Sequence, residues 1–276
     1  MTGIRIGIAQ PEISADARVN GKTVRAAMRK AAAARARLVQ FPEGMLTGYA
    51  KEQVADWSQV DWPVVRTELE RIQKLAAELR IWVVLGSAHP LTPPHRPHNS
   101  LYVISDAGEL VDRYDKRFCS HTEITHFYTP GFDPVVFDVD GYRFGTAICV
   151  EINFPHLFTQ YEQLGVECLL LSAYPVDPIF ELKARAYAAI NCYWVAMSLP
   201  AQTADLMPSG LITPTGTYTS QVTGPAGLTI ATIDREDPTF TVPLTQARPW
   251  RATARKGTIY RTRAVQDPRS RDHTTV

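Results

Sequence analysis

Strand-like and helix-like hydrophobic patterns alternate along the first third of the chain. In the first pattern apolar residues occupy every second position or short continuous runs, and in the second they recur every three or four residues. The first pattern predicts strands over residues 4–8, 38–41 and 81–85, the last of them ended by Gly86. The second predicts helices whose apolar stripes run from Val24 to Leu38 and from Val65 to Leu79. The chain is therefore expected to open as a β-α-β-α-β arrangement.

The remainder of the chain continues this alternation and adds hairpins. Further strands are predicted over residues 100–104, 135–139, 143–149, 168–171, 193–198 and 228–234, and further helices after Pro155 and over residues 179–192. The segments Asp106-Ala-Gly108 and Asp140-Gly141 are typical of hairpin turns, so some strand pairs should be antiparallel. The prolines between Thr92 and His98 indicate a surface loop. Together these elements predict an α/β domain with layered, mixed sheets.

Composition indicates where in the cell the protein is found and which classes of molecule it binds. The 276 residues include 29 Lys and Arg against 28 Asp and Glu, so no overall field attracts nucleic acid or an anionic membrane. The chain starts like a strand instead of a signal peptide, and no apolar run approaches the ~20 residues that span a bilayer. The four cysteines are too sparse for a disulfide framework and form no C-x-x-C pair. We expect a soluble, cytoplasmic protein with free thiols and a small-molecule substrate.

Residues 249–276 differ from the rest of the chain. They are rich in arginine and poor in acids, and their apolar content is lower. No aromatic interleaving or nucleic-acid-binding motif accompanies the positive charge, which favours a solvated or partner-docking extension. We therefore expect one domain over residues 1–248 and a basic C-terminal extension over residues 249–276.

One of the four cysteines occupies a position suited to catalysis. Cys149 closes a predicted strand and is followed by a short segment that leads into the helix after Pro155. Such a strand-to-helix elbow exposes a side chain at the sheet edge and points backbone N–H groups, here that of Val150, toward an oxyanion beside the thiol. A helix N-terminus also favours the thiolate. Taken alone, a cysteine at a strand end is more often an inert part of the core.

Three charged residues follow other predicted strands and turns. Glu43 comes after a strand, at the kind of strand end where open α/β sheets bind ligands, and is suited to act as a base. Lys116 also follows a strand, and an ammonium group beside a thiol would lower the thiol pKa and stabilise an oxyanion. Glu123 is suited to hold that ammonium in place. Each of the three alone is more simply explained as a loop or surface charge.

Taken together, these residues resemble the nitrilase superfamily of carbon-nitrogen hydrolases. The resemblance covers about residues 4–234 and includes the late Leu211-Ile-Thr-Pro-Thr-Gly216 segment. It rests on Phe41-Pro-Glu-Gly-Met-Leu-Thr-Gly-Tyr49, Tyr114-Asp-Lys116, Glu123 before Thr129-Pro-Gly131, and Gly145-Thr-Ala-Ile-Cys149-Val-Glu-Ile-Asn-Phe-Pro155. The order and the context of these segments match the family.

The resemblance implies a fold and a set of roles. It implies an α/β fold built as a four-layer α-β-β-α sandwich with two mixed sheets, and catalysis without a metal or an organic cofactor. Glu43 would be the general base, Lys116 the cation that stabilises the oxyanion, Cys149 the nucleophile and Glu123 a supporting residue. The backbone of Val150 would contribute to the oxyanion site. The resemblance also implies a homodimer or a larger homo-oligomer.

Departures from the family patterns bear on the substrate. Amidase-like members carry Cys-Tyr-Asp followed by Arg-Phe-Pro-Glu, and nitrilases carry Cys-Trp-Glu-Asn, whereas this chain has Cys149-Val-Glu-Ile-Asn153. The Leu46-Thr-Gly-Tyr49 segment resembles the amidase-like branch, so we expect a small amide, with a nitrile as the alternative substrate. Tyr49 and Tyr174 each follow an element of the expected active face and are candidate pocket residues, although core packing explains both equally well.

Two other classes of function compete with this one. A zinc site would need several imidazoles, and the candidates are His89, His95, His98, His121 and His126. Their spacing defines no fixed helical face, which favours solvated or hydrogen-bonding histidines. A non-catalytic binding module on the same scaffold is the other alternative, and the joint presence of all three expected catalytic residues argues against it.

Overall fold

Two six-stranded sheets form the centre of the computed structural model, which describes residues 3–274. The first sheet has the strand order β12-β1-β2-β3-β4-β5. Its strands span Ile4–Gln10 (β1), Leu38–Gln40 (β2), Trp82–His89 (β3), His98–Ile104 (β4), Leu110–Asp115 (β5) and Gly227–Ile233 (β12). Strands β1, β2 and β3 run parallel, and the pairs toward both edges are antiparallel.

The second sheet repeats this design with the order β11-β10-β9-β8-β7-β6. Its strands span Val136–Val139 (β6), Tyr142–Ile148 (β7), Cys168–Ser172 (β8), Trp194–Ser198 (β9), Gly210–Ile212 (β10) and Tyr218–Gln221 (β11). Strands β7, β8 and β9 are parallel, and the outer pairs are antiparallel. The predicted mixed sheets are thus confirmed.

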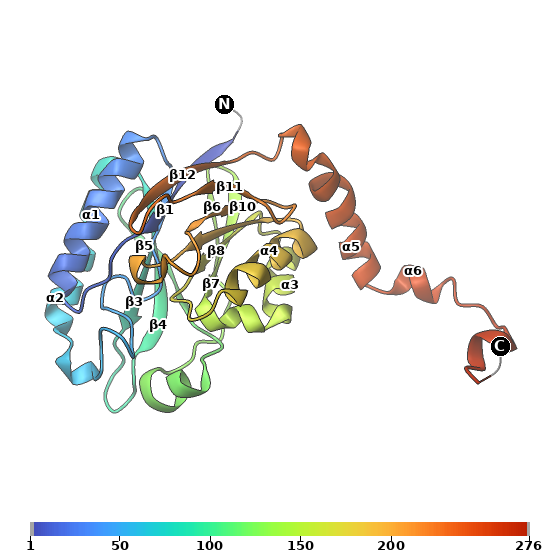
Figure 1. The fold of residues 1–276 in the computed structure, drawn as a ribbon, viewed down its shortest axis with the longest axis horizontal. Coiled ribbons are helices and arrows are strands. Elements are labelled where there is room, and N and C mark those ends of the chain that lie inside the picture. Colours follow the sequence, from blue (N-terminus) through green and yellow to red (C-terminus); the bar gives the residue numbers. More distant parts are fainter. Residues whose placement is uncertain (1–2, 275–276) are drawn as a thin grey trace.

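The two sheets pack face to face, and helices cover their outer faces (Figure 1). The covering helices are α1 (Ala17–Ala33) and α2 (Trp62–Leu79) on the first sheet, and α3 (Pro155–Gln163) and α4 (Ile179–Asn191) on the second. Between the sheets, Ile6 and Leu101 of the first meet Phe144 and Leu170 of the second in one apolar cluster. This arrangement confirms the expected four-layer sandwich. Within the described residues, every helix is too short or too polar to traverse a lipid bilayer.

Two local predictions were wrong for reasons that lie in the tertiary structure. Strand β3 does not end at Gly86 but continues to His89. A Cβ atom at Gly86 would lie 2.0 Å from the carbonyl oxygen of Pro42, so the glycine allows close approach of another segment instead of ending the strand. His98, which we assigned to the proline-rich loop, is the first residue of β4 and pairs with His89.

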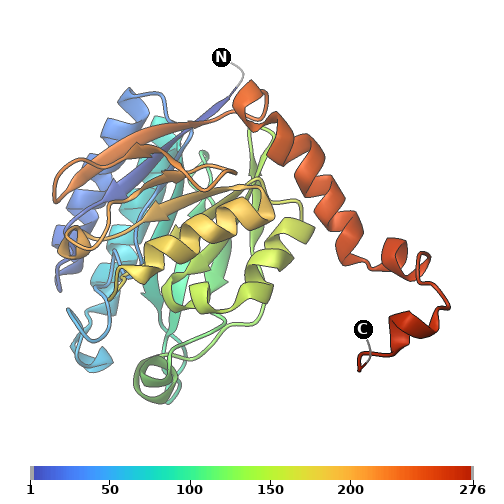
Figure 2. The ribbon, with the colours of Figure 1, turned by 45° about the vertical axis from the view of Figure 1, so that its right-hand side comes forward.

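The C-terminal residues form short helices that project from the sandwich (Figures 1 and 2). These are α5 (Arg248–Arg255), α6 (Thr258–Arg261) and α7 (Pro268–Arg271). The guanidinium group of Arg251 donates to the carbonyl oxygens of Ala189 and Ile190 at the end of α4, and Arg255 pairs with Glu162 of α3. Helix α5 is thus anchored to the outer helices of the second sheet, and the division into a domain and an extension stays a prediction.

Candidate active site

Three strand ends bring the chemically reactive side chains to one edge of the sandwich. Glu43 follows β2 and Lys116 follows β5 in the first sheet, whereas Cys149 follows β7 in the second. The site therefore lies where the two sheets meet, and neither sheet alone supplies all three side chains. Carboxyl ends of parallel strands such as β2 and β7 are the usual place for a ligand in α/β proteins.

Lys116 is completely buried and lies between two buried carboxylates. Its Nζ is 2.9 Å from Oε1 of Glu43 and 2.8 Å from Oε1 of Glu123. Burial alone would lower the pKa of Lys116, but the two carboxylates outweigh it and hold that pKa well above its usual value. Burial would raise the pKa of Glu123, but Lys116 outweighs it and lowers that pKa. Lys116 and Glu123 are therefore charged at neutral pH.

Backbone and amide groups fix the two carboxylates. Asn99 Nδ2 donates to Oε1 of Glu43 at 2.7 Å, and the backbone N–H of Tyr174 donates to Oε2 at 3.0 Å. The backbone N–H of Ser120 donates to Oε2 of Glu123 at 2.7 Å. Each buried carboxylate thus has partners for both oxygens, which is the condition for burying such a group without a large cost.

Cys149 lies at the elbow between β7 and the outer helix layer. Its φ of +46° is in the left-handed region, which residues other than glycine rarely adopt and which often marks a functional site. Residues Cys149–Asn153 form a tight turn before α3 begins. The Sγ of Cys149 donates to the carbonyl oxygen of Tyr174 at 3.6 Å, and the residue is partly exposed. The predicted strand-to-helix elbow is present.

The thiol of Cys149 is neutral in the resting structure. Burial of the sulfur raises its pKa well above the usual value and Glu43 raises it further, whereas Lys116 lowers it by a smaller amount. The direction is opposite to the one that the sequence suggested. The sequence suggested that the ammonium of Lys116 would have the largest effect on the thiol pKa. In the structure two carboxylates pair with this ammonium, and burial of the sulfur disfavours the charged thiolate. Thiolate formation therefore requires a base, and Glu43 is the carboxylate that acts most strongly on the thiol.

A further buried carboxylate, that of Glu151, connects the elbow to the lysine segment. It accepts hydrogen bonds from the backbone N–H groups of Ile148 at 2.7 Å and Arg117 at 2.8 Å. The hydroxyl of Tyr114 also donates to it. Ile148 immediately precedes the candidate nucleophile and Arg117 immediately follows the candidate cation. One carboxylate thus bridges the two sheets beside the site.

A cavity of about 130 Å³ adjoins the sulfur of Cys149. Tyr49 and Tyr174 stack on its wall with ring centroids 4.5 Å apart, and Val150 and Glu123 also line it. The structure therefore places both candidate pocket tyrosines at the cavity. The other two predicted residues, the candidate base and cation, are completely buried and do not line it.

Sequence reasoning missed several residues of this site. Asn99 was not singled out, although a polar residue at the start of an apolar strand is a possible signal for it. Glu151 was noted only as part of a family motif, and its distance of two residues from the nucleophile was the available signal. Lys51 and Lys183 also line the cavity. No local pattern indicates either lysine, because each reaches the site through tertiary structure alone.

The histidines considered for zinc make ordinary hydrogen bonds. The ring of His89 lies 2.8 Å from the hydroxyl of Tyr102 and 2.6 Å from a guanidinium nitrogen of Arg113. The ring of His98 lies 2.8 Å from the carbonyl oxygen of Thr129. In the part of the chain that the structure describes, no three His, Cys, Asp or Glu side chains cluster as a metal site would require.

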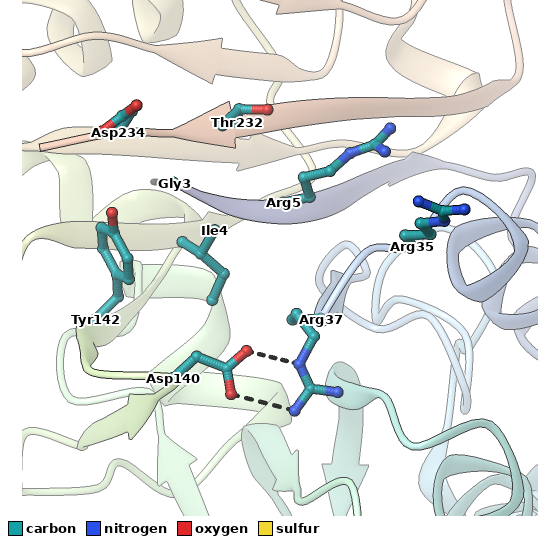
Figure 3. Close-up of a pocket in the computed structure, with 9 residues that line it drawn as sticks. All are labelled: Gly3, Ile4, Arg5, Arg35, Arg37, Asp140, Tyr142, Thr232 and Asp234. Atoms are coloured by element: carbon teal, nitrogen blue, oxygen red, sulfur yellow. Dashed lines mark hydrogen bonds and ion pairs between the residues drawn. The ribbon is translucent and has the colours of Figure 1, made fainter. Parts of the chain in front are cut away.

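A larger cavity of about 430 Å³ lies near the start of β1 (Figure 3). On its wall Arg37 points toward Asp140, and Nε of the arginine is 2.6 Å from the carboxylate. Arg37 also pairs with Asp106, so it connects turns of the two sheets. The described residues on this wall include no cysteine. This cavity therefore offers no thiol for acyl transfer.

The chain is similar to known enzymes over most of its length. The model of the family described as carbon-nitrogen hydrolase matches residues 5–251. A hydrolase of Mycobacterium tuberculosis is 29% identical over 245 residues, which cover 81% of this chain and 83% of that protein. A human omega-amidase is 24% identical over 216 residues, which cover 73% of this chain and 76% of that protein. The solved amidase of Nesterenkonia, from the nitrilase superfamily, is 18% identical, covers 91% of this chain and 98% of its own, and has a TM-score of 0.75.

Proposed function

The chain belongs to the carbon-nitrogen hydrolase family, and from this premise we propose that it hydrolyses a small amide through a thioester on Cys149. The observation that carries the proposal is the buried chain of ion pairs from Glu43 through Lys116 to Glu123, beside a cysteine that reaches a cavity. The human and the Nesterenkonia relatives are both named amidases, which supports an amide substrate over a nitrile. The products would be a carboxylate and ammonia or an amine.

The first half of the reaction forms the thioester. Glu43 accepts the thiol proton while the sulfur of Cys149 attacks the carbonyl carbon of the amide. The ammonium of Lys116 and the backbone N–H of Val150 stabilise the negative charge on the carbonyl oxygen. The carbon–nitrogen bond then breaks, and the proton held by Glu43 goes to the leaving nitrogen.

The second half of the reaction hydrolyses the thioester. Glu43 removes a proton from water, the oxygen adds to the thioester carbonyl, and the carbon–sulfur bond breaks. Glu43 returns this proton to the sulfur, so one amide and one water give one carboxylic acid and one ammonia or amine, which at neutral pH are released as a carboxylate and an ammonium ion. Glu123 also raises the pKa of Lys116, and its carboxylate keeps the ammonium protonated while Glu43 carries the transferred proton. Lys116 therefore acts as a fixed positive charge, and Glu123 supports it.

Ammonia release from small amides and nitriles tests the proposal. Cys149→Ala should abolish turnover and the acyl adduct that intact-mass spectrometry detects in the wild type. Cys119→Ala is the matched control, because Cys119 is partly exposed near the site but does not line the cavity. Unchanged turnover in Cys149→Ala would overturn the mechanism. Carboxylate formation from nitriles but not from amides would reassign the substrate class.

Self-association is part of the same proposal. The outer face of α4 exposes Ile179, Leu182 and Ile190, with exposed fractions of 52%, 63% and 57%. Apolar side chains grouped on one helix face are typical of protein interfaces. We expect light scattering to give the mass of a dimer or of a larger assembly. A monomeric mass at all protein concentrations would contradict this expectation.

A further inference from the structure

The cavity near the start of β1 carries two arginines whose charges the protein itself does not pair. Arg5 belongs to β1 and Arg35 lies just after α1, and both line this cavity of about 430 Å³ (Figure 3). Within the part of the chain that the structure describes, neither guanidinium group donates a hydrogen bond or forms an ion pair. Arg37 on the same wall differs, because it pairs with Asp140 and Asp106. Two positive charges are therefore available to a ligand in this cavity.

The backbone brings Arg5 and Arg35 to the same end of the cavity. The backbone N–H of Arg37 donates to the carbonyl oxygen of Arg5 at 2.8 Å, so the segment that carries Arg35 is tied to β1. Arg35 has a φ of +61°, a left-handed conformation that glycine usually supplies at the end of a helix. Both guanidinium groups lie toward the right of Figure 3, away from Tyr142. A phosphate group has enough anionic oxygens to accept hydrogen bonds from both arginines at once.

A hydroxyl group adds a neutral donor beside these arginines. Thr232 of β12 also lines the cavity, and it is the cross-strand partner of Arg5 in the antiparallel pair of β1 and β12. Cross-strand partners project from the same face of a sheet, with Cβ atoms about 4.5–5.5 Å apart. The hydroxyl of Thr232 is therefore within reach of an anionic group that Arg5 binds.

The opposite wall of the cavity suits hydroxyl groups better than a second anion. Asp234 follows Thr232 by two residues, and Figure 3 shows it with Tyr142 toward the left of the cavity. Its carboxylate accepts the backbone N–H of Glu236 at 2.9 Å. A carboxylate accepts hydrogen bonds from hydroxyl groups and repels another negative charge. The cavity thus combines one end for an anion with another end for hydrogen-bond donors.

We propose that this cavity binds a phosphomonoester of a hydroxylated molecule, such as a sugar phosphate. The phosphate contacts Arg5, Arg35 and Thr232, and the hydroxyl groups of the ligand face Asp234. A volume of about 430 Å³ holds roughly fourteen water-sized groups, at the volume that one water occupies in the liquid. This size suits a pentose phosphate and lies within the usual range of small-molecule pockets.

The proposed site lies at the opposite ends of the strands that carry the candidate catalytic residues. On this cavity wall Arg37 precedes β2 and Tyr142 begins β7. Glu43 and Cys149 follow the same two strands at their other ends. The phosphomonoester therefore binds away from the thiol and is not the substrate of Cys149. The proposal does not rest on the proposed function, and ligand binding and ammonia release are measured separately.

Isothermal titration calorimetry of the full chain with ribose 5-phosphate tests the proposal. We expect saturable binding that weakens as NaCl is added, because salt screens exposed charges. Arg5→Met should raise Kd at least tenfold, as expected for the loss of a charged hydrogen-bond donor. Arg35→Gly should raise Kd similarly and stay folded, since glycine is favoured at a φ of +61°. Arg66→Met is the control, because it removes an exposed arginine of α2 that does not line the cavity, and it should keep the wild-type Kd.

Two simpler ligands separate the contributions of the two ends of the cavity. Ribose and inorganic phosphate should each bind at least tenfold more weakly than ribose 5-phosphate. Asp234→Asn should weaken the binding of ribose 5-phosphate and should not weaken that of inorganic phosphate. The absence of saturable binding of ribose 5-phosphate, or a wild-type Kd in both Arg5→Met and Arg35→Gly, would overturn the proposal. Inorganic phosphate that binds as tightly as ribose 5-phosphate would also overturn it, because the hydroxyl groups would then contribute nothing.

Discussion

Glu151→Gln tests how strongly one buried carboxylate holds the edges of the active site together. The two oxygens of Glu151 accept the backbone N–H groups of Ile148, Arg117 and Phe118 and the hydroxyl of Tyr114. Glutamine has the same shape, but its NH₂ group donates and does not accept. In the better orientation its oxygen serves Arg117 and Phe118, and its NH₂ faces the N–H of Ile148. In the reverse orientation two backbone N–H groups face a donor.

The expected magnitude follows from the better orientation. One buried N–H that loses its acceptor costs about 1–3 kcal/mol, and hydrogen bonds to a charged group contribute about 1 kcal/mol more than neutral ones. Burial raises the pKa of Glu151, although Tyr114 and the backbone groups act against it, so the charge itself is costly at this position. The neutral glutamine recovers part of that cost. We expect a net loss of about 2 kcal/mol in the free energy of unfolding.

Urea denaturation measures this loss of stability, and steady-state kinetics show whether the active site is affected. The unpaired N–H belongs to Ile148, next to Cys149, so kcat should fall under conditions in which the variant is fully folded. Glu167→Gln is the matched control, because Glu167 accepts the N–H of Arg143 at 3.0 Å near the start of β7. A loss in Glu151→Gln no larger than in this control would refute the reasoning.

Three further predictions concern the geometry and the titration of the site. Gly86→Ala should lower kcat, because the new Cβ would lie 2.0 Å from the carbonyl oxygen of Pro42 and would displace the segment that carries Glu43. Unchanged kcat and KM in this variant would contradict the idea that the contact between Gly86 and Pro42 positions Glu43. The rate of Cys149 alkylation by iodoacetamide should still be rising at pH 9, because burial raises the thiol pKa, and a plateau below pH 8 would show that the thiol is already ionised there. Burial lowers the pKa of His89 from 6.5 to about 4, so between these values the unfolded chain binds a proton that the folded protein does not. The free energy of unfolding should therefore decrease as pH falls through this window, and urea denaturation of His89→Gln should show a shallower decrease.

Local patterning was sufficient for most of the secondary structure. The continuous apolar run over residues 168–171 predicted a buried strand, and β8 spans Cys168–Ser172. Such a run can be buried on both faces only inside a layered fold, so its environment follows from its composition. The predicted end of β3 was wrong because Gly86 is required by a close contact with the segment after β2, and its neighbours in sequence do not show this contact. A glycine that ends a strand and a glycine that admits another backbone give the same local signal.

The candidate site was predictable as a set of residues but not as a set of contacts. Motif order indicated Glu43, Lys116 and Cys149, whereas no motif indicated that Asn99 holds the first carboxylate or that Asn153 holds Lys183. Both asparagines act across separate elements, and their partners depend on how the two sheets are placed. Hydrogen bonds of this kind follow only from the packed structure.

Burial and an imbalance of charge together raise the pKa of the Cys149 thiol in the resting structure. Two carboxylates share the single ammonium of Lys116, so the buried cluster carries a net negative charge. That charge helps to keep Cys149 protonated until Glu43 removes the proton. A cluster with one carboxylate fewer would give a more acidic thiol, because both carboxylates raise the thiol pKa.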